Sequence, residues 1–210
     1  SPCRCAESVV EGLRALGHEF LIVDSEEIED WVLALADCDL VIDHTDTFRG
    51  RGLYRSLVRH LLESSGARVI GPSAAAFCRA DNKAAVKARL AEAGIPVPPG
   101  IAAQSENWEL PAWLRPPLVV KPAFEHMSRG VHLAETEVEA RGITRRLLES
   151  MHGPVLIESF IGGVEIAASI LATPKGLQVL PLLEWKFSDN ETRVLTEGFK
   201  LSEDPGVAPR

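Results

Sequence analysis

The chain has 210 residues, of which 46% are hydrophobic and 25% are charged. That is long enough for one or two domains with a buried core and argues against a fibrous or disordered protein. With 22 lysines and arginines against 30 aspartates and glutamates, the net charge is -8, so the molecule as a whole repels nucleic acid and anionic lipid. Charged residues or prolines interrupt every hydrophobic stretch well before the ~20 residues that cross a bilayer. We therefore expect neither a nucleic-acid partner nor a membrane partner.

The sequence shows neither a secretion signal nor a disulfide framework. Residues 1–15 lack the apolar core of a signal peptide, and the cysteines at positions 3, 5, 38 and 78 are scattered. Cys3 and Cys5 form a Cys-x-Cys step that a soft metal could use, but no second ligand pair follows at zinc-site spacing. We expect a cytoplasmic protein with reduced thiols.

The first 74 residues form one predicted domain, in which helices alternate with short apolar strands. Helices are predicted over 6–16, from a Ser25 cap, and over 53–62; strands are predicted over 20–23, 40–42 and 68–70. This alternation is typical of a parallel α/β sheet, where ligands bind beyond the carboxyl ends of the strands. His44 follows such a strand and is either a substrate-binding or acid/base residue, or a loop histidine bonded to its neighbours. Since the unit opens on a helix, we expect a first strand to be missing.

Residues 75–162 form a second predicted domain with a different pattern. A helix over 81–93 and a proline-rich step over 96–100 precede strands at 118–121, 131–134 and 155–158. Thr136 and Glu139 form a capping box that begins a helix ending near Ser150. The pattern predicts a small antiparallel sheet with one or two helices. Strands over 165–171 and 177–182 would begin a third, incomplete domain over 163–210, whose tail from Lys186 is polar and without periodicity.

Two lysines in the second domain indicate an anion site. Lys121 ends a buried strand, where an ammonium is costly unless an anion meets it, so it is a candidate ligand for phosphate or carboxylate. Lys83 opens a helix and is either a second cation for the same anion or a solvated helix lysine. Together they could hold a polyphosphate. The glycine-rich dinucleotide and P-loop signatures are both missing from the sequence.

Acidic and small residues near these lysines extend the candidate site. The segment from Glu125 to Gly130, with Ser128 inside it, either contacts phosphate or is a plain hairpin turn. Glu158 and Glu165 either accept hydrogen bonds from a ribose or an exocyclic amine, or form salt bridges at a buried edge. The residues alone identify neither a catalytic side chain nor a metal site.

Taken in order, these motifs resemble the ATP-grasp superfamily, most closely the D-alanine–D-alanine ligases. The resemblance spans about residues 6–182 and implies a Rossmann-like N-terminal α/β domain, a small α+β lid domain and the start of a C-terminal ATP-grasp sheet. The segments that carry it are Asp81-Asn82-Lys83 with Lys87, Gly94 to Pro98, Val119 to Pro122, Glu125 to Val131, Val155 to Glu158, and Phe160 to Gly163 with Glu165.

The resemblance also implies roles for individual residues. Lys83 and Lys121 would bind the ATP phosphates, and the loop holding Glu125 and Ser128 would close over them. Four residues would hold the rest of the nucleotide and one a substrate: Glu158, Phe160 and Ile161 at the adenine, Glu165 at the ribose, and His44 at an amino acid.

The implied reaction is amide formation through an acyl phosphate, from ATP and amino-acid or small-peptide substrates, as in peptidoglycan biosynthesis. Family members commonly form homodimers. Their metal-binding acids lie further on, in a segment ending with a Glu-x-Asn pair that this chain lacks, so we expect the Mg2+ ligands outside this chain and an inactive fragment. The alternative is a non-catalytic protein that binds a nucleotide or a partner without a magnesium site.

Overall fold

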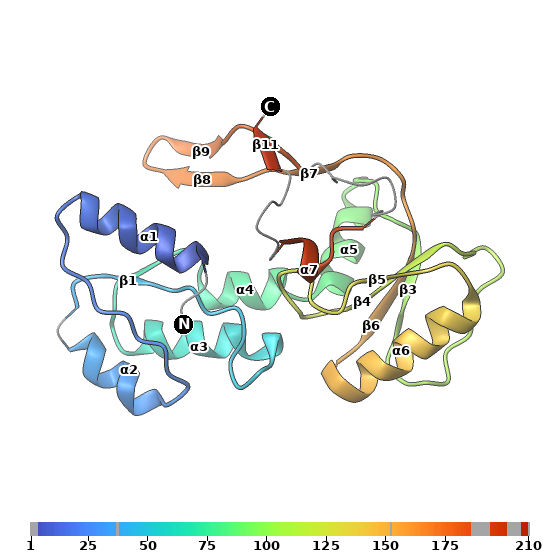
Figure 1. The fold of residues 1–210 in the computed structure, drawn as a ribbon, viewed down its shortest axis with the longest axis horizontal. Coiled ribbons are helices and arrows are strands. Elements are labelled where there is room, and N and C mark those ends of the chain that lie inside the picture. Colours follow the sequence, from blue (N-terminus) through green and yellow to red (C-terminus); the bar gives the residue numbers. More distant parts are fainter. Residues whose placement is uncertain (1–3, 37, 152, 186–193, 201–206, 210) are drawn as a thin grey trace. The chain divides into compact units, whose positions relative to one another are not determined.

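The computed structural model describes residues 4–36, 38–151, 153–185, 194–200 and 207–209. It divides into two compact units, Ser1–Asp81 and Asn82–Arg210, each a mixture of helices and sheet (Figure 1). The α/β class predicted from the sequence is confirmed. The predicted boundaries after residues 74 and 162 stay predictions, since the division found lies after Asp81.

The first unit is built around a small parallel sheet. Its strands β1 and β2 pair in parallel with Val41 opposite Val69, as the alternation of helices and strands predicts. Phe48, Val58 and Leu62 form the buried core beside them. The elements in chain order are α1 (Arg4–Ala15), α2 (Ile28–Leu35), β1 (Val41–Ile42), the 3-10 helix η1 (Gly52–Tyr54), α3 (Arg55–Ser64), β2 (Val69–Ile70) and α4 (Ala74–Ala80).

Two predictions for this unit are wrong. Residues 20–23 are not a strand, because a strand requires a hydrogen-bonded neighbour and this segment pairs with none of the described strands. Ser25 is not the helix cap: α2 begins after Glu27, while the Ser25 hydroxyl accepts from the Glu27 amide and donates to Asp30 at 2.6 Å. The sequence pattern also missed α4, whose N-cap Ser73 accepts from the Ala76 amide.

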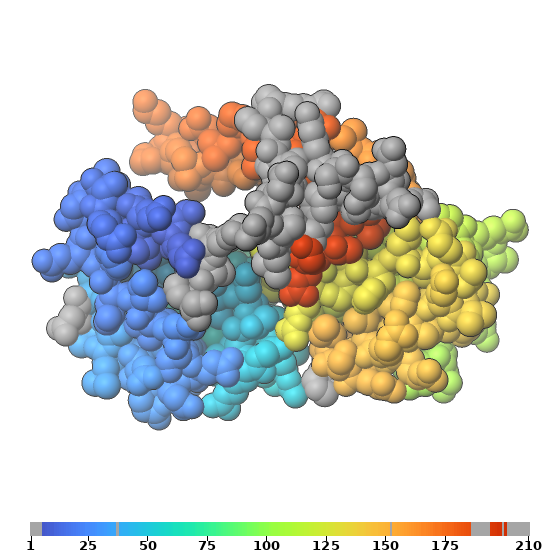
Figure 2. Space-filling view, in the orientation of Figure 1, coloured from blue at the N-terminus to red at the C-terminus, as the bar shows by residue number. Residues whose placement is uncertain are grey.

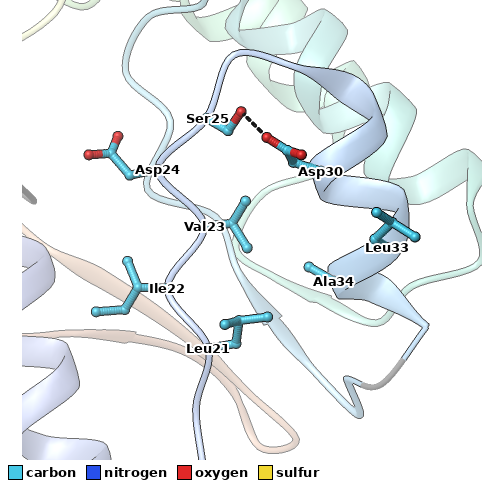
Figure 3. Close-up of a pocket in the computed structure, with 8 residues that line it drawn as sticks. All are labelled: Leu21, Ile22, Val23, Asp24, Ser25, Asp30, Leu33 and Ala34. Carbon is cyan, nitrogen blue, oxygen red and sulfur yellow. Dashed lines mark hydrogen bonds between the residues drawn. The ribbon is translucent and has the colours of Figure 1, made fainter.

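The unpaired segment lines an open groove of about 470 Å³ in the first unit. Figure 3 shows Leu21 to Val23 on one side and Leu33 and Ala34 of α2 on the other, with the Ser25–Asp30 hydrogen bond between them. Its ionisable side chains, Asp24 and Asp30, are both acidic. These negative charges would repel a polyphosphate, so this groove is not the predicted anion site.

A buried arginine secures the carboxyl end of β2. The Arg59 guanidinium, whose side chain is 4% exposed, donates to the carbonyls of Val69, Ile70 and Gly71 at 2.8–3.2 Å. Its Nε pairs with Glu63 at 3.0 Å, and the same carboxylate oxygen accepts from the Ala74 amide. One side chain of α3 thus ties β2 to the start of α4.

Replacing Arg59 tests this contribution to stability. Arg59→Met removes the donor that three carbonyls share and leaves the Glu63 carboxylate with the Ala74 amide, so we expect the free energy of unfolding to fall by about 3 kcal/mol. Urea denaturation followed by circular dichroism measures the change. Arg68→Met is the matched control, because the exposed Arg68 side chain makes one long hydrogen bond within the described residues, to the Asp39 carbonyl at 3.3 Å. Equal losses in the two variants would contradict the special role of Arg59.

The second unit contains a four-stranded antiparallel sheet in the order β3-β6-β4-β5, with α6 packed across one face (Figure 1). The small antiparallel sheet is the one predicted, although β3 was missed. The outer side of α6, yellow to orange in Figure 2, lies on the surface. The elements are α5 (Lys83–Glu92), β3 (Gly100–Ala103), β4 (Leu118–Pro122), β5 (His132–Ala134), α6 (Glu137–Met151) and β6 (Val155–Ser159).

The two faces of this sheet differ in chemistry. Leu118 and Val120 of β4 join Val155 and Ile157 of β6 in the hydrophobic core beneath α6. The predicted capping box begins α6: the Glu139 amide donates to the Thr136 hydroxyl, and the Glu139 carboxylate accepts from the Thr136 amide. Because side chains alternate along a strand, the intervening residues of β4 and β6 are directed to the opposite face.

Further strands follow the four-stranded sheet, where the sequence predicted the start of another. β10 pairs antiparallel with both β7 and β11, and β8 and β9 form a separate hairpin. Residues 186–193 and 201–206 of the predicted polar tail lie outside the described residues. In the described segments, we find no helix with the length and apolar character of a membrane span. The elements are β7 (Glu165–Ala167), β8 (Ile170–Thr173), β9 (Gly176–Val179), β10 (Leu183–Trp185), α7 (Glu197–Lys200) and β11 (Val207–Pro209).

His132 on β5 has a lowered pKa. Partial burial is the larger cause and the Arg146 charge on α6 is the smaller one, and together they bring the pKa below the ordinary 6.5. Protonation of His132 therefore favours the unfolded chain. Above pH 6.5 this destabilisation does not occur. It develops as the pH falls from 6.5 through the lowered pKa.

Arg146→Gln tests the smaller cause. Removing the charge should raise the pKa of His132 part of the way toward 6.5, because burial remains. An NMR titration of the His132 ring protons measures the pKa directly. Arg145→Gln, the neighbouring exposed position on α6, should leave it unchanged. A pKa that does not move in Arg146→Gln would exclude the charge effect.

Candidate functional site

One buried carboxylate between two lysines marks the candidate site, which lies wholly within the second unit. Glu158 has a side chain only 3% exposed, and its Oε1 is 2.5 Å from the Lys87 ammonium. Its Oε2 is 2.6 Å from the Lys121 ammonium. Two ammonium groups around one carboxylate leave one positive charge in excess. The cluster can therefore attract an anion even though the protein as a whole carries a net charge of -8.

The register of β4 and β6 explains why Lys121 and Glu158 meet. Lys121 lies opposite Leu156, and Glu158 lies two residues further along β6. Residues that lie opposite each other, and residues two apart along a strand, share a face of the sheet, so both charged side chains are on the face away from α6. The apolar residues between them occupy the core. The alternating pattern thus places Leu118, Val120, Val155 and Ile157 under α6 and puts Lys121 and Glu158 on the opposite face, beside Val119 and Leu156.

Gly100 makes room for Glu158 from the neighbouring strand. It lies directly opposite Glu158 in the pairing of β3 with β6. A Cβ atom at position 100 would lie 2.5 Å from the Ile157 carbonyl oxygen and 2.9 Å from the Glu158 Cγ. A side chain of any size at this position would displace the backbone that aims the carboxylate.

Lys83 lies at the start of α5, where Asn82 caps the helix by accepting from the amides of Ala84 and Ala85. The Lys83 ammonium donates to the carbonyls of Ala123 and Glu125, at 3.3 and 2.5 Å. These carbonyls follow β4 directly, so Lys83 lies beside the segment that Lys121 leads into. Whether Lys83 also binds phosphate stays a prediction.

The loop from Glu125 to Gly130 is held at both ends. Glu125 is buried and pairs with Arg129 at 3.3 Å, while at Gly130, which has φ +71°, an added Cβ would lie 3.1 Å from both Pro122 and Leu147. Between them, Met127 and Ser128 adopt φ of 52° and 60°, a conformation that costs energy for residues other than glycine. Closure over phosphate stays a prediction.

The remaining predicted residues are more scattered. The Phe160 amide donates to the Pro117 carbonyl at 3.0 Å, Ile161 is exposed, and the Glu165 carboxylate accepts from the Leu195 amide at 3.2 Å. His44 belongs to the first unit, in the loop after β1 where Asp43 accepts from the Thr45 amide. Their assignments to adenine, ribose and substrate stay predictions.

Two residues of the site were not among the predicted ligands. Lys87 was part of the sequence motif, but the sequence analysis gave it no role. Its spacing of four residues from Lys83 places both lysines on one face of the predicted helix, and this spacing was the signal that could have revealed Lys87 as a site residue. Gly100 has no such local signal, because its close approach to Glu158 depends on pairing between distant strands.

The described carboxylates do not form a magnesium site. Among the residues with assigned positions, no group of three or more His, Cys, Asp or Glu side chains is arranged to hold a metal ion. Glu158 and Glu125 instead pair with cations, which is a poor donor set for Mg2+.

Sequence comparison identifies related proteins. The chain is 34% identical over 180 residues to a D-alanine–D-alanine ligase of Synechococcus, covering 82% of the chain and 53% of the relative. It is 27% identical over 203 residues to an uncharacterized protein of Sinorhizobium fredii, covering 92% of the chain and 59% of the relative. The chain therefore spans between half and three fifths of the length of these relatives. No protein-family model matches it.

Structural comparison gives the fold. The D-alanine–D-alanine ligase of Bacillus anthracis in complex with ATP matches 92% of the chain and 59% of its own length, with a TM-score of 0.66 and 22% identity. An N5-carboxyaminoimidazole ribonucleotide synthetase in complex with ADP matches 91% of the chain and 50% of its own length, with a TM-score of 0.64 and 17% identity. The chain thus has the fold of the ATP-grasp superfamily. In sequence and in fold it is similar to the D-alanine–D-alanine ligases, which confirms the resemblance seen in the sequence.

Gly100→Ala tests the close approach that positions Glu158. The added methyl group cannot fit 2.5 Å from a backbone carbonyl, so we expect a loss of about 1–3 kcal/mol in the free energy of unfolding. Gly142→Ala is the matched control, because Gly142 lies within α6 and its Cβ would make only an ordinary contact, at 3.7 Å. There, alanine should stabilise the helix by about 0.5–1 kcal/mol. Thermal unfolding of both variants measures the difference; stabilisation at both positions would contradict the steric argument.

Proposed function

We propose that this chain is the nucleotide-binding part of an ATP-dependent carboxylate–amine ligase of the D-alanine–D-alanine ligase type. The single observation that carries the proposal is the Lys87–Glu158–Lys121 cluster, a site of net positive charge around a buried carboxylate in an acidic protein. Relatives named D-alanine–D-alanine ligase and the ATP complex of a solved neighbour support it.

The proposed nucleotide site uses both ends of this cluster. Lys121 binds a phosphate oxygen of ATP, and Lys83, whose ammonium lies beside the same segment, assists it. The Glu158 carboxylate accepts a hydrogen bond from the exocyclic amine of adenine, near the backbone of Phe160 and Ile161. Glu165 accepts from the ribose. The 125–130 loop, with Ser128 at a strained φ of 60°, closes over the phosphates.

The proposed chemistry is phosphoryl transfer followed by amide formation. The terminal phosphoryl group moves from ATP to a substrate carboxylate, and an amine then attacks the acyl phosphate and releases inorganic phosphate. Ammonium groups from the chain stabilise the charge on the moving phosphoryl group. Closure of the loop excludes water, which would otherwise hydrolyse the acyl phosphate. Mg2+ remains an expectation from the resemblance.

The substrates are proposed only as a class. His44 follows the carboxyl end of β1, where α/β sheets bind ligands, and it would orient an amino acid or a small peptide. The segment Arg49-Gly50-Arg51-Gly52 carries two positive charges near it in sequence, where the resemblance leads us to expect acidic residues. A substrate other than D-alanine is therefore compatible with the proposal, as is a role in peptidoglycan biosynthesis.

ATP binding by the 210-residue chain tests the proposal. We expect calorimetry to detect binding of ATP, and Lys121→Ala to weaken it about tenfold to a hundredfold, because one charged hydrogen bond to phosphate is lost. Lys175→Ala is the control, since Lys175 lies exposed in the β8–β9 turn. Unchanged affinity in Lys121→Ala would exclude the lysine site.

A phosphate-release screen over amino acids then separates the enzyme from the non-catalytic alternative. ATP binding without amino-acid-dependent phosphate release, by both this chain and the complete gene product, would favour a nucleotide-binding protein that ligates nothing.

A further inference from the structure

The two lysines at Glu158 are not equivalent. The Lys87 ammonium has a second acceptor, the Pro98 carbonyl at 2.7 Å, in the segment that leads into β3. Lys87 therefore joins α5, that segment and β6 at one point. Within the described ranges, the Lys121 ammonium has Glu158 as its one polar partner. An ammonium can donate three hydrogen bonds, so Lys121 has donors to spare and Lys87 is the better anchored of the two.

The presence of two lysines at Glu158 allows one of them to bind an anion while the other stays with the carboxylate. If Lys121 turns from Glu158 to a phosphate oxygen, a buried carboxylate loses one of its two counter-ions. A carboxylate that is 3% exposed and without a counter-ion would be costly to keep charged. With Lys87 still at 2.5 Å, the charge of Glu158 remains compensated and its Oε2 becomes available as an acceptor.

We propose that Lys87 is a positioning residue: it is the fixed counter-ion that keeps Glu158 an aimed carboxylate while Lys121 transfers to the phosphates. This inference rests on the proposed nucleotide site and adds a cause for base selectivity. A charged carboxylate only accepts hydrogen bonds, so it binds the exocyclic amine of adenine and rejects a carbonyl at the same position. A protonated Glu158 would lose that discrimination, because its O–H donates to a carbonyl.

Once Lys121 has moved, Lys87 is the remaining counter-ion of Glu158 among the elements described around it. β3, which pairs with β6 on one side, contains no titratable side chain, and β4 on the other side contributes Lys121 alone. From α5, Lys87 reaches Glu158, whereas Lys83 reaches the Ala123 and Glu125 carbonyls. β6 itself carries no other ionisable residue.

Lys87→Met tests the inference in the 210-residue chain, with ATP, inosine triphosphate and inorganic tripolyphosphate as ligands. Inosine triphosphate differs from ATP by a carbonyl in place of the amine. In Lys87→Met, release of Lys121 to the phosphates leaves Glu158 uncompensated, so Glu158 takes up a proton from solvent as the ligand binds. We expect about one extra proton per ligand bound compared with the original chain. The affinity of the variant for all three ligands should rise as the pH falls.

The selectivity should change as well. We expect the preference for ATP over inosine triphosphate to fall about tenfold or more in Lys87→Met. Calorimetry in buffers of different ionisation enthalpy counts the protons, and the same titrations give the affinities. Lys87→Arg, which keeps the positive charge, should restore both the proton count and the preference. Lys175→Met, at an exposed turn, should match the original chain.

The outcomes separate this inference from the proposed function. If the original chain binds none of the three ligands, the proposed nucleotide site is wrong, and the role of Lys87 in it is wrong as well. If the original chain binds ATP, and Lys87→Met has the same proton count and base preference, the role of Lys87 is overturned while the nucleotide site stands. If Lys87→Met does not fold, the combined variant Lys87→Met, Glu158→Gln decides. Removing both charges together should restore folding, and failure to do so overturns the inference.

Discussion

The second unit depends on keeping one carboxylate charged inside a protein. Glu158 is almost completely buried, and a lone carboxylate there would cost more than the hydrophobic core around it could readily offset. Lys87 and Lys121 remove that cost from two directions, one from helix α5 and one from strand β4. The helix, the sheet and the entry to β3 are therefore joined by charge as well as by hydrophobic packing.

The surrounding structure follows from this requirement. Alternation along β4 and β6 directs one set of apolar residues toward α6 and puts both Lys121 and Glu158 on the opposite face. Gly100 gives the carboxylate lateral space, and the Pro98 carbonyl fixes one lysine. Because Lys87 compensates Glu158 before any ligand arrives, Lys121 is the lysine of this pair that has to move in the proposed binding step, which limits the cost of reorganisation.

The sequence predicted those parts of the structure that depend on local chemistry. Lys121 was singled out because a lysine ending an apolar strand needs an anion, and the structure gives it Glu158. The capping box at Thr136 is likewise local and was found at the expected place. The strand predicted over residues 20–23 was wrong because strand formation depends on a distant partner. An apolar run does not specify that neighbouring strand. Gly100 was missed because its requirement comes from a strand more than fifty residues away.

Every residue of the proposed nucleotide site comes after Asp81, whereas His44 and the Arg49–Gly52 segment come before it. Each of the two compact units thus contains one half of the proposed chemistry. Mutations that alter the choice of amino acid can accumulate in the first unit without disturbing the electrostatic balance around Glu158. Under the proposed function, one phosphoryl-donor unit could serve different acceptors.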